Sequence, residues 1–333
     1  MTPRTGPWEL SSRTDRFPGE LVTRRGGRIS ASEDAPAFIH IAPRSMPLPV
    51  LIAAPHAGRA YGEELLAAMR DPLHSQLRLE DRHVDALGVE IARATGTGLL
   101  VAHAPRAMLD LNRAENDVDW EMIAEKPGSL PVQTRRNRQP VGGNARARSG
   151  LGLVPRRLPG FGEIWRQPLA REELDRRISD IHQPYHEFLA AELVRIRDAW
   201  GAALLIDLHS MPPLRKHDGE GEAPQIVVGD RFGASCDNAL IGRSFAYLEQ
   251  HGCIAAHNRP YSGGYVLDRH AAPQRNIHAI QLEICRSTYL DPTLSQPSAS
   301  LKPLAKMLAG LVRELGACTA SLASRGDIAQ AAE

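Results

Sequence analysis

The 333-residue sequence is poor in several features that mark whole classes of proteins. Aromatic residues make up only 5% of the chain, which argues against a platform that stacks single-stranded nucleic acid. The 40 Lys and Arg residues are balanced by 39 Asp and Glu residues, so the chain is not a globally basic nucleic-acid binder. No stretch approaches the ~18 consecutive apolar residues of a membrane span, and the charged N-terminus lacks the apolar run of a signal peptide. We therefore expect a soluble, cytoplasmic protein with neither a nucleic acid nor a membrane as partner.

Cysteines are few and lie far apart. The four positions are Cys236, Cys253, Cys285 and Cys318, and no two of them form a C-x-x-C pair. This pattern argues against a disulfide framework and against a zinc site built from thiolates. A reducing compartment is the expected environment.

Apolar residues make up 42% of the chain, enough to build a full core. Short, nearly continuous apolar runs predict strands covered on both faces, and they occupy residues 49–54, 98–103, 203–208, 225–229 and 277–283. Apolar residues spaced by three or four predict helices at 84–91, 174–196 (with a kink at Pro184), 237–251 and 301–316. Alternating strands and helices predict an α/β fold, a three-layer mixed sheet with helices on both faces.

The composition also divides the chain into segments. Residues 1–45 are rich in Arg, Gly, Pro and Ser and are expected to form an irregular lead-in, followed by a single α/β domain over 46–316 and a flexible tail over 317–333. Within the domain, residues 126–162 contain no acidic residue while arginines accumulate, which indicates a basic loop insertion. A solvated surface loop is the plain interpretation, and a positive rim that attracts anionic substrates is the alternative.

Polar side chains follow the predicted strands at the points where the strands end. His56 comes after the first apolar run, His209 comes after the third, and Glu283 closes the last. Ligands of open α/β sheets bind outside the carboxyl ends of the strands, so these positions are candidates for function. Two histidines and a carboxylate form a common catalytic zinc set, because they leave a fourth position for water. His56 and His209 are therefore candidate metal ligands.

The carboxylate of such a set is less clearly marked. An H-x-x-E pair would place it three residues after His56, but that residue is Arg59. Asp81, at a predicted helix start, is the chosen ligand, and the alternatives left open are Asp85, Glu63 and Glu64. A carboxylate that simply favours a helix N-terminus is the competing explanation for each of them.

Further candidates suit the binding of an anionic substrate. Arg113 offers a planar fork that matches a carboxylate, Asn112 adds an amide donor, and Arg106 could polarise a carbonyl and stabilise a developing oxyanion. A glycine pair between tyrosines suits a loop whose backbone approaches a ligand closely, and it supplies Tyr261, Gly263, Gly264 and Tyr265.

In their order along the chain, these motifs resemble the N-formylglutamate amidohydrolase family. The motifs are Pro55-His56-Ala57-Gly58, Asp81-Arg82-His83-Val84-Asp85, Leu109-Asp110-Leu111-Asn112-Arg113, Gln183-Pro184-Tyr185-His186, Asp207-Leu208-His209-Ser210-Met211-Pro212, Gly229-Asp230-Arg231-Phe232-Gly233-Ala234-Ser235-Cys236, Gly263-Gly264-Tyr265 and His278-Ala279-Ile280-Gln281-Leu282-Glu283. The resemblance implies a zinc-carboxypeptidase-like (phosphorylase/hydrolase-like) fold, shared with aspartoacylases. It also implies that His56, Asp81 and His209 hold the metal, that Glu283 is the general base, and that Asn112 and Arg113 bind the substrate carboxylate.

The expected function is hydrolysis of the amide bond of a small N-acyl amino acid, with N-formyl-L-glutamate converted to glutamate and formate. One zinc ion, or another divalent ion that accepts histidine and carboxylate ligands, is the expected cofactor. A deacylase for another N-acyl amino acid and a small-peptide amidase are the enzymatic alternatives, and a catalytically silent carboxylate-binding protein is the non-enzymatic one. Arg82 stands where the family often has an aromatic residue, which makes family membership a safer expectation than substrate identity.

Overall fold

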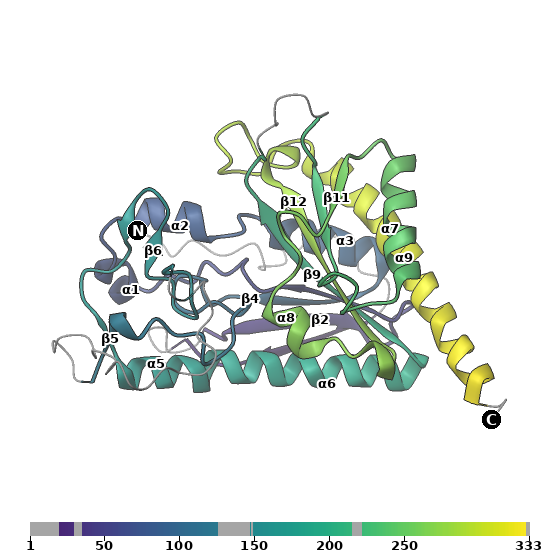
Figure 1. The fold of residues 1–333 in the computed structure, drawn as a ribbon, viewed down its shortest axis with the longest axis horizontal. Coiled ribbons are helices and arrows are strands. Elements are labelled where there is room, and N and C mark those ends of the chain that lie inside the picture. The colour runs from purple at the N-terminus through teal and green to yellow at the C-terminus, as the bar shows by residue number, and fades with distance from the viewer. Residues whose placement is uncertain (1–19, 30–34, 126–146, 148, 215–221, 331–333) are drawn as a thin grey trace.

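A computed structural model describes residues 20–29, 35–125, 147, 149–214 and 222–330, apart from the side chains of 324–330. Its centre is an eight-stranded mixed sheet (Figure 1). In spatial order the strands are β1 (Leu21–Gly26), β2 (Phe38–Pro43), β4 (Gly98–Ala102), β3 (Val50–Ala54), β9 (Ala203–Met211), β12 (Ile277–Cys285), β10 (Ile226–Gly229) and β11 (Ala255–His257). The central strands β4, β3, β9 and β12 run parallel to one another. On one side β2 pairs antiparallel with β4 and with β1, and on the other side β10 pairs antiparallel with β12 and parallel with β11.

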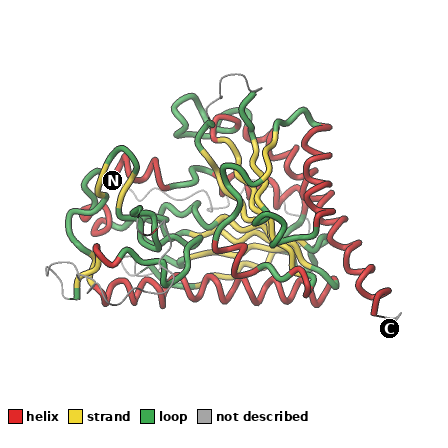
Figure 2. The backbone as a smooth tube through the Cα atoms, in the orientation of Figure 1, coloured by secondary structure: helices red, strands yellow, loops and turns green. Residues whose placement is uncertain are grey.

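Helices cover both faces of this sheet (Figure 2). One face carries α5 (Arg171–Arg177), a π-helical turn (Ile178–His182) and α6 (Gln183–Trp200), and the other carries α3 (Val84–Thr95), α7 (Asn238–Gln250) and α9 (Leu301–Gln330). Shorter elements lie around the site, namely α1 (Glu63–Ala68), α2 (Pro72–Leu79) and α8 (Tyr265–His270), with the two-residue strands β5 (Ile123–Ala124), β6 (Arg157–Leu158), β7 (Gly162–Glu163) and β8 (Leu169–Ala170).

The side chains of the central strands alternate between two apolar cores. In β3, Leu51 and Ala53 pack into the core beneath α6, while Val50 and Ile52 pack into the core with α3 and α9. All of them are at most 1% exposed, because a helix layer covers each face of the sheet. The predicted three-layer mixed sheet is thereby confirmed.

The prediction of an irregular lead-in over residues 1–45 is wrong for its second half. Within the described residues, β1 and β2 add two antiparallel strands at the edge of the sheet, next to β4. The abundant Arg, Gly and Pro around them obscure the apolar residues of β2, and β1 is an edge strand with exposed side chains. Residues 1–19 lie outside the described part of the chain.

The long helix along one face is interrupted just before Pro184, where a kink was expected. Pro184 has no N–H to donate to the carbonyl of Asp180, and the chain forms a π-helical turn there. The Asp180 carbonyl accepts a hydrogen bond from the backbone N–H of Arg28 at 2.8 Å instead. The proline therefore creates an attachment point for the segment that follows β1.

The last helix extends beyond its expected end. We predict a helix over 301–316 followed by a flexible tail over 317–333, but α9 continues to Gln330. The residues after 316 are rich in alanine, which has the highest intrinsic helix propensity. None of the helices in the described residues is long and apolar enough to cross a membrane.

The basic segment 126–162 is described only from residue 147 onward, without 148. In its described part, Arg156 pairs with Asp119 at 3.0 Å and with Glu121 at 2.9 Å, and Arg157 pairs with Glu163 at 2.6 Å. These two arginines serve local ion pairs and do not form a bare positive rim. The other arginines of the segment, Arg135, Arg136, Arg138, Arg146 and Arg148, lie outside the described residues.

Candidate active site

Three parallel strands end at one edge of the sheet and bring the candidate residues together. β3 leads directly to His56, β9 carries Asp207 and His209, and β12 carries Gln281 and Glu283. β9 and β12 pair so that Gln281 lies opposite Asp207 and Glu283 lies opposite His209. Because side chains two apart share one face of a strand, this register places four polar side chains side by side.

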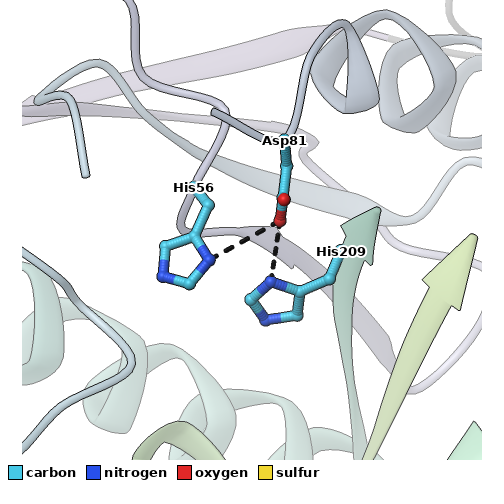
Figure 3. A group of neighbouring side chains, drawn as sticks. All are labelled: His56, Asp81 and His209. Carbon is cyan, nitrogen blue, oxygen red and sulfur yellow. Dashed lines mark hydrogen bonds and ion pairs between the residues drawn. The ribbon is translucent and has the colours of Figure 1, made fainter. Parts of the chain in front are cut away.

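His56 and His209 both turn toward the carboxylate of Asp81 (Figure 3). The Nδ1 atom of His209 is 2.9 Å from Asp81 Oδ2, and the Nδ1 atom of His56 is 3.5 Å from the same oxygen. Ligand atoms of these three buried residues lie within 4.8 Å of one another, a group that could hold a metal ion. Asp81 reaches this position from the turn between α2 and α3, where its N–H donates to the carbonyl of His56 at 3.0 Å.

The remaining ring nitrogen of each histidine faces a second buried carboxylate. His56 Nε2 is 2.7 Å from Asp110 Oδ1, and His209 Nε2 is 2.8 Å from Asp207 Oδ2. A neutral imidazole that donates its Nε2–H to a carboxylate keeps the Nδ1 lone pair free for a cation. Metal-binding histidines are oriented by this kind of outer carboxylate. The donor set and its outer partners therefore fit a divalent cation.

The alternative carboxylates are engaged elsewhere or are exposed. Asp85 forms a two-pronged ion pair with Arg59, whose Nη2 lies 2.7 Å from Oδ2. Glu63 and Glu64 begin α1 and are exposed to solvent. Arg59 stands at the position of the glutamate in an H-x-x-E pair, and it holds the Asp85 carboxylate in this ion pair. Asp81 is the carboxylate that meets both histidines.

Burial and these contacts shift the protonation of the cluster in opposite directions. Burial by itself disfavours charge on His209, but Asp207 and Asp81 hold the pKa of His209 well above its usual value. Burial would likewise raise the pKa of Asp81, yet hydrogen bonds from His209 and His56 hold the pKa of Asp81 below its usual range. The shift of His209 reflects the buried carboxylates of Asp207 and Asp81, whose negative charge a bound cation would compensate.

Glu283 lies next to this cluster and is less acidic than an ordinary glutamate. Burial, only partly offset by His209, raises the pKa of Glu283 to about 7. Its Oε1 atom accepts a hydrogen bond from Gln281 Nε2 at 2.9 Å, which orients the carboxylate. A carboxylate with a pKa near neutrality can both accept and return a proton, as a general base must.

A cavity of about 400 Å³ opens over these residues, a size suited to a small ligand. Its lining is formed by His56, Arg78, Asp81, Arg106, Asn112, Arg113, Leu151, His209, Ser210, Pro212, Tyr261, Ser262, Gly263, Gly264, Gln281, Glu283 and Arg286. The structure thus brings all but one of the sequence-predicted site residues to a single cavity.

Tyr265 is the one predicted site residue that does not line the cavity. It is the first residue of α8. Its ring packs against His182 and His186, with centroids 5.8 and 5.3 Å apart. Its hydroxyl oxygen accepts a hydrogen bond from Arg269 at 2.7 Å. The prediction that Tyr265 contacts the ligand from the Gly-Gly loop is therefore not supported by its position.

Arg106 lies in the cavity wall with a fixed orientation. Its Nε donates to Asp110 Oδ2 at 2.9 Å, so one carboxylate holds both Arg106 and His56. Burial works against its charge, but Asp110 and Asp81 raise the pKa of Arg106 above its usual value. The guanidinium is therefore a permanent positive charge close to the candidate metal ligands.

Asn112 connects the start of α8 to Gln281, the hydrogen-bond partner of Glu283. Its Oδ1 accepts the N–H of Val266 at 2.9 Å, and its Nδ2 lies 3.4 Å from Gln281 Oε1. A Cβ atom at Gly264 would lie 2.5 Å from that same Oδ1, so only glycine permits the approach. The Gly-Gly loop thus packs against Asn112 as well as lining the cavity.

Arg113 is buried, and part of its guanidinium already serves the backbone. Nε donates to the carbonyl of Leu151 at 3.0 Å, and Nη1 donates to the carbonyl of Asn112 at 2.7 Å. Asp117 also lies 3.8 Å from Nε. These contacts orient the side chain along the cavity wall and leave less of the fork for a ligand than the sequence suggests.

A model of the N-formylglutamate amidohydrolase family matches residues 48–290 of the chain. The chain belongs to this family. An N-formylglutamate deformylase from Pseudomonas aeruginosa is 30% identical over 276 residues, which are 80% of this chain and 91% of the relative. One from Pseudomonas putida is 32% identical over 252 residues, which are 74% of this chain and 83% of the relative.

Two solved structures have a similar architecture. An N-formylglutamate amidohydrolase from Ralstonia eutropha JMP134 superimposes with a TM-score of 0.72 at 26% identity, over 87% of this chain and 99% of that one. A protein from Agrobacterium tumefaciens, the gene product Atu2144, has a TM-score of 0.59 at 16% identity, over 81% of this chain and 90% of its own. The second likeness concerns the fold alone.

Several residues in the cavity lining or behind it have roles that the sequence alone does not indicate. Asp110 and Asp207 lie inside recognised motifs, but only the folded chain shows that they hold the two histidines. Arg286 donates to Ser210 Oγ at 3.0 Å and lies 3.4 Å from Asp81 Oδ1, so it holds the outer oxygen of that carboxylate. The signal that could have found Arg286 is its place directly after β12, three residues beyond Glu283. Arg78 carries no comparable signal.

Proposed function

We propose that the protein hydrolyses the formyl amide bond of N-formyl-L-glutamate and releases L-glutamate and formate. The observation that carries this proposal is the grouping of His56, Asp81 and His209 beside Glu283, at the floor of a small cavity rich in arginine. Family membership supports it, because the two curated relatives are named for deformylation of N-formylglutamate. The substrate is small and anionic, and the cavity is small and lined by basic side chains.

We also propose that His56, Asp81 and His209 hold a zinc ion. Two imidazole nitrogens and one carboxylate oxygen are a common ligand set of catalytic zinc, and Asp110 and Asp207 would orient the imidazoles. When bound, zinc supplies a Lewis acid that polarises the formyl oxygen and makes water more acidic. The buried negative charge of this cluster also explains why a cation would bind there.

Glu283 performs the proton transfers in this proposal. Its carboxylate takes a proton from the attacking water and then delivers a proton to the departing amine nitrogen, so the C–N bond breaks without expelling an amide anion. A pKa of about 7 suits both steps, because the group exchanges protons readily near neutral pH. Gln281 keeps the carboxylate oriented during the exchange.

The arginines and Asn112 position the substrate and stabilise charge. Arg106, held by Asp110, faces the developing negative charge on the formyl oxygen. Arg113 and Asn112 bind the carboxylate next to the scissile amide, which fixes the orientation of the substrate before attack. The loop with Tyr261, Gly263 and Gly264 closes the other side of the cavity.

Formate release from N-formyl-L-glutamate by the purified protein tests the activity, and Glu283→Gln tests the base. We expect Glu283→Gln to lower kcat by at least ~10²-fold while the bound zinc remains, because it preserves side-chain shape and removes the base. Chelation should abolish turnover of the native protein, and added zinc should restore it. A panel of N-acetyl and N-succinyl amino acids distinguishes a deformylase from a broader deacylase. A protein that binds these compounds without turnover would be the silent carboxylate-binding alternative.

A further inference from the structure

Arginines with different surroundings line the cavity. Arg106 is paired with Asp110 at 2.9 Å, and Arg286 lies 3.4 Å from Asp81. Arg113 donates to backbone carbonyls of the cavity wall. These side chains hold parts of the site in place, and Arg78 differs from them.

Arg78 reaches the cavity from the last turn of α2 and is exposed. None of the described carboxylates lies within ion-pair distance of its guanidinium. Its guanidinium carbon instead lies 5.3 Å from the ring centroid of Phe161. A ring that covers one face of a guanidinium leaves the in-plane N–H groups free to meet a carboxylate. Within the described residues, Arg78 is therefore a cation that an aromatic ring, and not a carboxylate, holds in position.

Phe161 is placed there by the short hairpin of β6 and β7. The ring is 57% exposed and belongs to neither core, so it does not serve to stabilise the fold by burial. It stacks on His74, with centroids 3.6 Å apart, and His74 lies one turn before Arg78 on α2. The ring thus touches both residues of one helix face.

Backbone hydrogen bonds tie this hairpin to the chain that leads into α2. Arg70 N donates to the carbonyl of Ile164 at 2.8 Å, and Arg166 N donates to the carbonyl of Ala68 at 2.9 Å. In Figure 1 the hairpin strand β6 lies beside α2, on the side of the site opposite β12. The position of Phe161 is therefore determined by the fold, although the residue itself is solvent-exposed.

We propose that Arg78, stacked on Phe161, binds the side-chain carboxylate of a dicarboxylic N-formyl amino acid, while Arg113 and Asn112 bind the carboxylate next to the amide. This inference rests on the proposed function and deepens it, because it assigns the residue that selects an acidic side chain. The substrate class is an N-formyl amino acid whose side chain ends in a carboxylate. An N-formyl amino acid with a neutral side chain of the same length has no charge for Arg78 to bind, so Arg78 does not increase its affinity.

The test compares N-formyl-L-glutamate with N-formyl-L-glutamine, which has the same shape and a neutral side chain. For Arg78→Gln we expect kcat/KM to fall by about 10- to 100-fold with the glutamate substrate, mainly through KM, and by less than about 3-fold with the glutamine substrate. Phe161→Leu should lower kcat/KM by about 2- to 5-fold for N-formyl-L-glutamate alone, because the ring positions the guanidinium of Arg78. The matched control is Arg243→Gln, which changes an exposed arginine on α7 that does not line the cavity and should behave like the native protein.

A second measurement keeps the inference separate from the proposed activity. Calorimetry measures the affinity of both compounds for the Glu283→Gln variant and for the double variant that also carries Arg78→Gln. Because neither protein has the base, the ratio of the two affinities gives the selectivity without turnover. If Arg78→Gln lowers the affinity for both compounds by the same factor, or for neither, the inference is overturned even when the native protein releases formate. If the native protein releases no formate but Arg78 still favours the acidic compound in binding, the proposed reaction fails and the inference stands.

Discussion

Two groups of buried histidines contact residues 110–113, and they differ in what surrounds them. His56 and His209, with ring centroids 4.7 Å apart, face the carboxylates of Asp81, Asp110 and Asp207. The second group, His182, His186 and His270, faces backbone carbonyls and other imidazoles, and its one carboxylate neighbour among the described residues is the half-exposed Glu115, 3.4 Å from His182 Nδ1. Of the two, only the first group, together with Asp81, brings three ligand atoms within 4.8 Å of one another in the described part of the chain.

The hydrogen bonds of the second group determine its tautomers. A carbonyl only accepts, so His186 donates Nε2–H to Leu111 O at 3.0 Å, and its Nδ1 accepts from His270 Nε2–H at 2.8 Å. His182 likewise donates to the carbonyl of Arg113 at 2.8 Å. These rings hold the backbone on both sides of Asn112, and the His186 lone pair is already used.

The surroundings also separate the two groups by charge. Asp207 and Asp81 overcome burial and hold the pKa of His209 well above its usual value. Burial dominates in the second group, where it keeps the pKa of His186 well below its usual value and lowers that of His270 to about 3. Buried carboxylates, and not the number of histidines, therefore distinguish a candidate cation site from a neutral structural cluster.

The largest expected effect comes from removing a ring of the first group. His209→Ala or His56→Ala should abolish zinc binding and lower turnover by at least ~10³-fold, beyond the 10- to 100-fold typical of outer-shell changes. His186→Ala is the matched control, because it removes the same ring from the second group and should keep its zinc. Elemental analysis and circular dichroism measure metal content and folding. Full zinc occupancy in both site variants would remove them from the ligand set.

A smaller effect is expected from an outer carboxylate. Asp207→Asn keeps the shape of the side chain but weakens the hold on His209 Nε2, which lies 2.8 Å away. We expect zinc affinity to fall by about 10- to 100-fold, since outer-shell partners orient the ligand and raise its basicity. Competition with a chromogenic chelator measures this change. An unchanged affinity would mean that Asp207 serves packing and not the cation site.

In the second group the same kind of change should act on stability. His186→Ala leaves the buried Leu111 carbonyl without its donor and creates a void, so we expect a loss of about 2–5 kcal/mol in the free energy of unfolding. His186→Gln retains an N–H donor and should lose less. Urea unfolding of zinc-loaded protein provides the values. Loss of zinc without loss of stability would contradict the assignment of a structural role.

The smallest expected effect is a difference in pH dependence. Unfolded His270 takes up a proton below pH ~6.5, whereas the folded form does so only near pH 3, so the unfolded state binds more protons between these values. The stability that neutral His270 contributes is therefore complete above pH ~6.5 and is lost as the pH falls toward 3. Between pH 6.5 and pH 5 the loss is about 2 kcal/mol.

His270→Gln isolates this contribution, because it keeps an N–H donor for His186 and cannot titrate. We expect the free energy of unfolding of the native protein to fall more steeply with decreasing pH than that of the variant. Parallel urea titrations at pH 7, 6 and 5 measure the two slopes. Equal slopes would show that folding does not lower the pKa of His270.

Local sequence was sufficient for the elements that carry the first group. The apolar runs at 49–54, 203–208 and 277–283 became β3, β9 and β12, and parallel strands ending at one edge bring His56, His209 and Glu283 together. The weakly patterned elements were the ones missed. β1 exposes polar side chains at an edge, and in the described part of the chain its one partner strand is β2, so its strand character depends on that neighbour.

By itself, the sequence determined the layered fold, the strand-end histidines and Glu283, because short-range periodicity and strand termini are local properties. Only the tertiary structure decided which carboxylate meets the histidines. Asp85 forms its ion pair with Arg59, whereas Asp81 faces both imidazole rings. The same is true of Asp110 and Asp207 as histidine partners, and of Phe161 beneath Arg78. These pairs join residues on different elements or depend on the exact direction of a side chain, and such contacts exist only after the sheet register and the loops around it have formed.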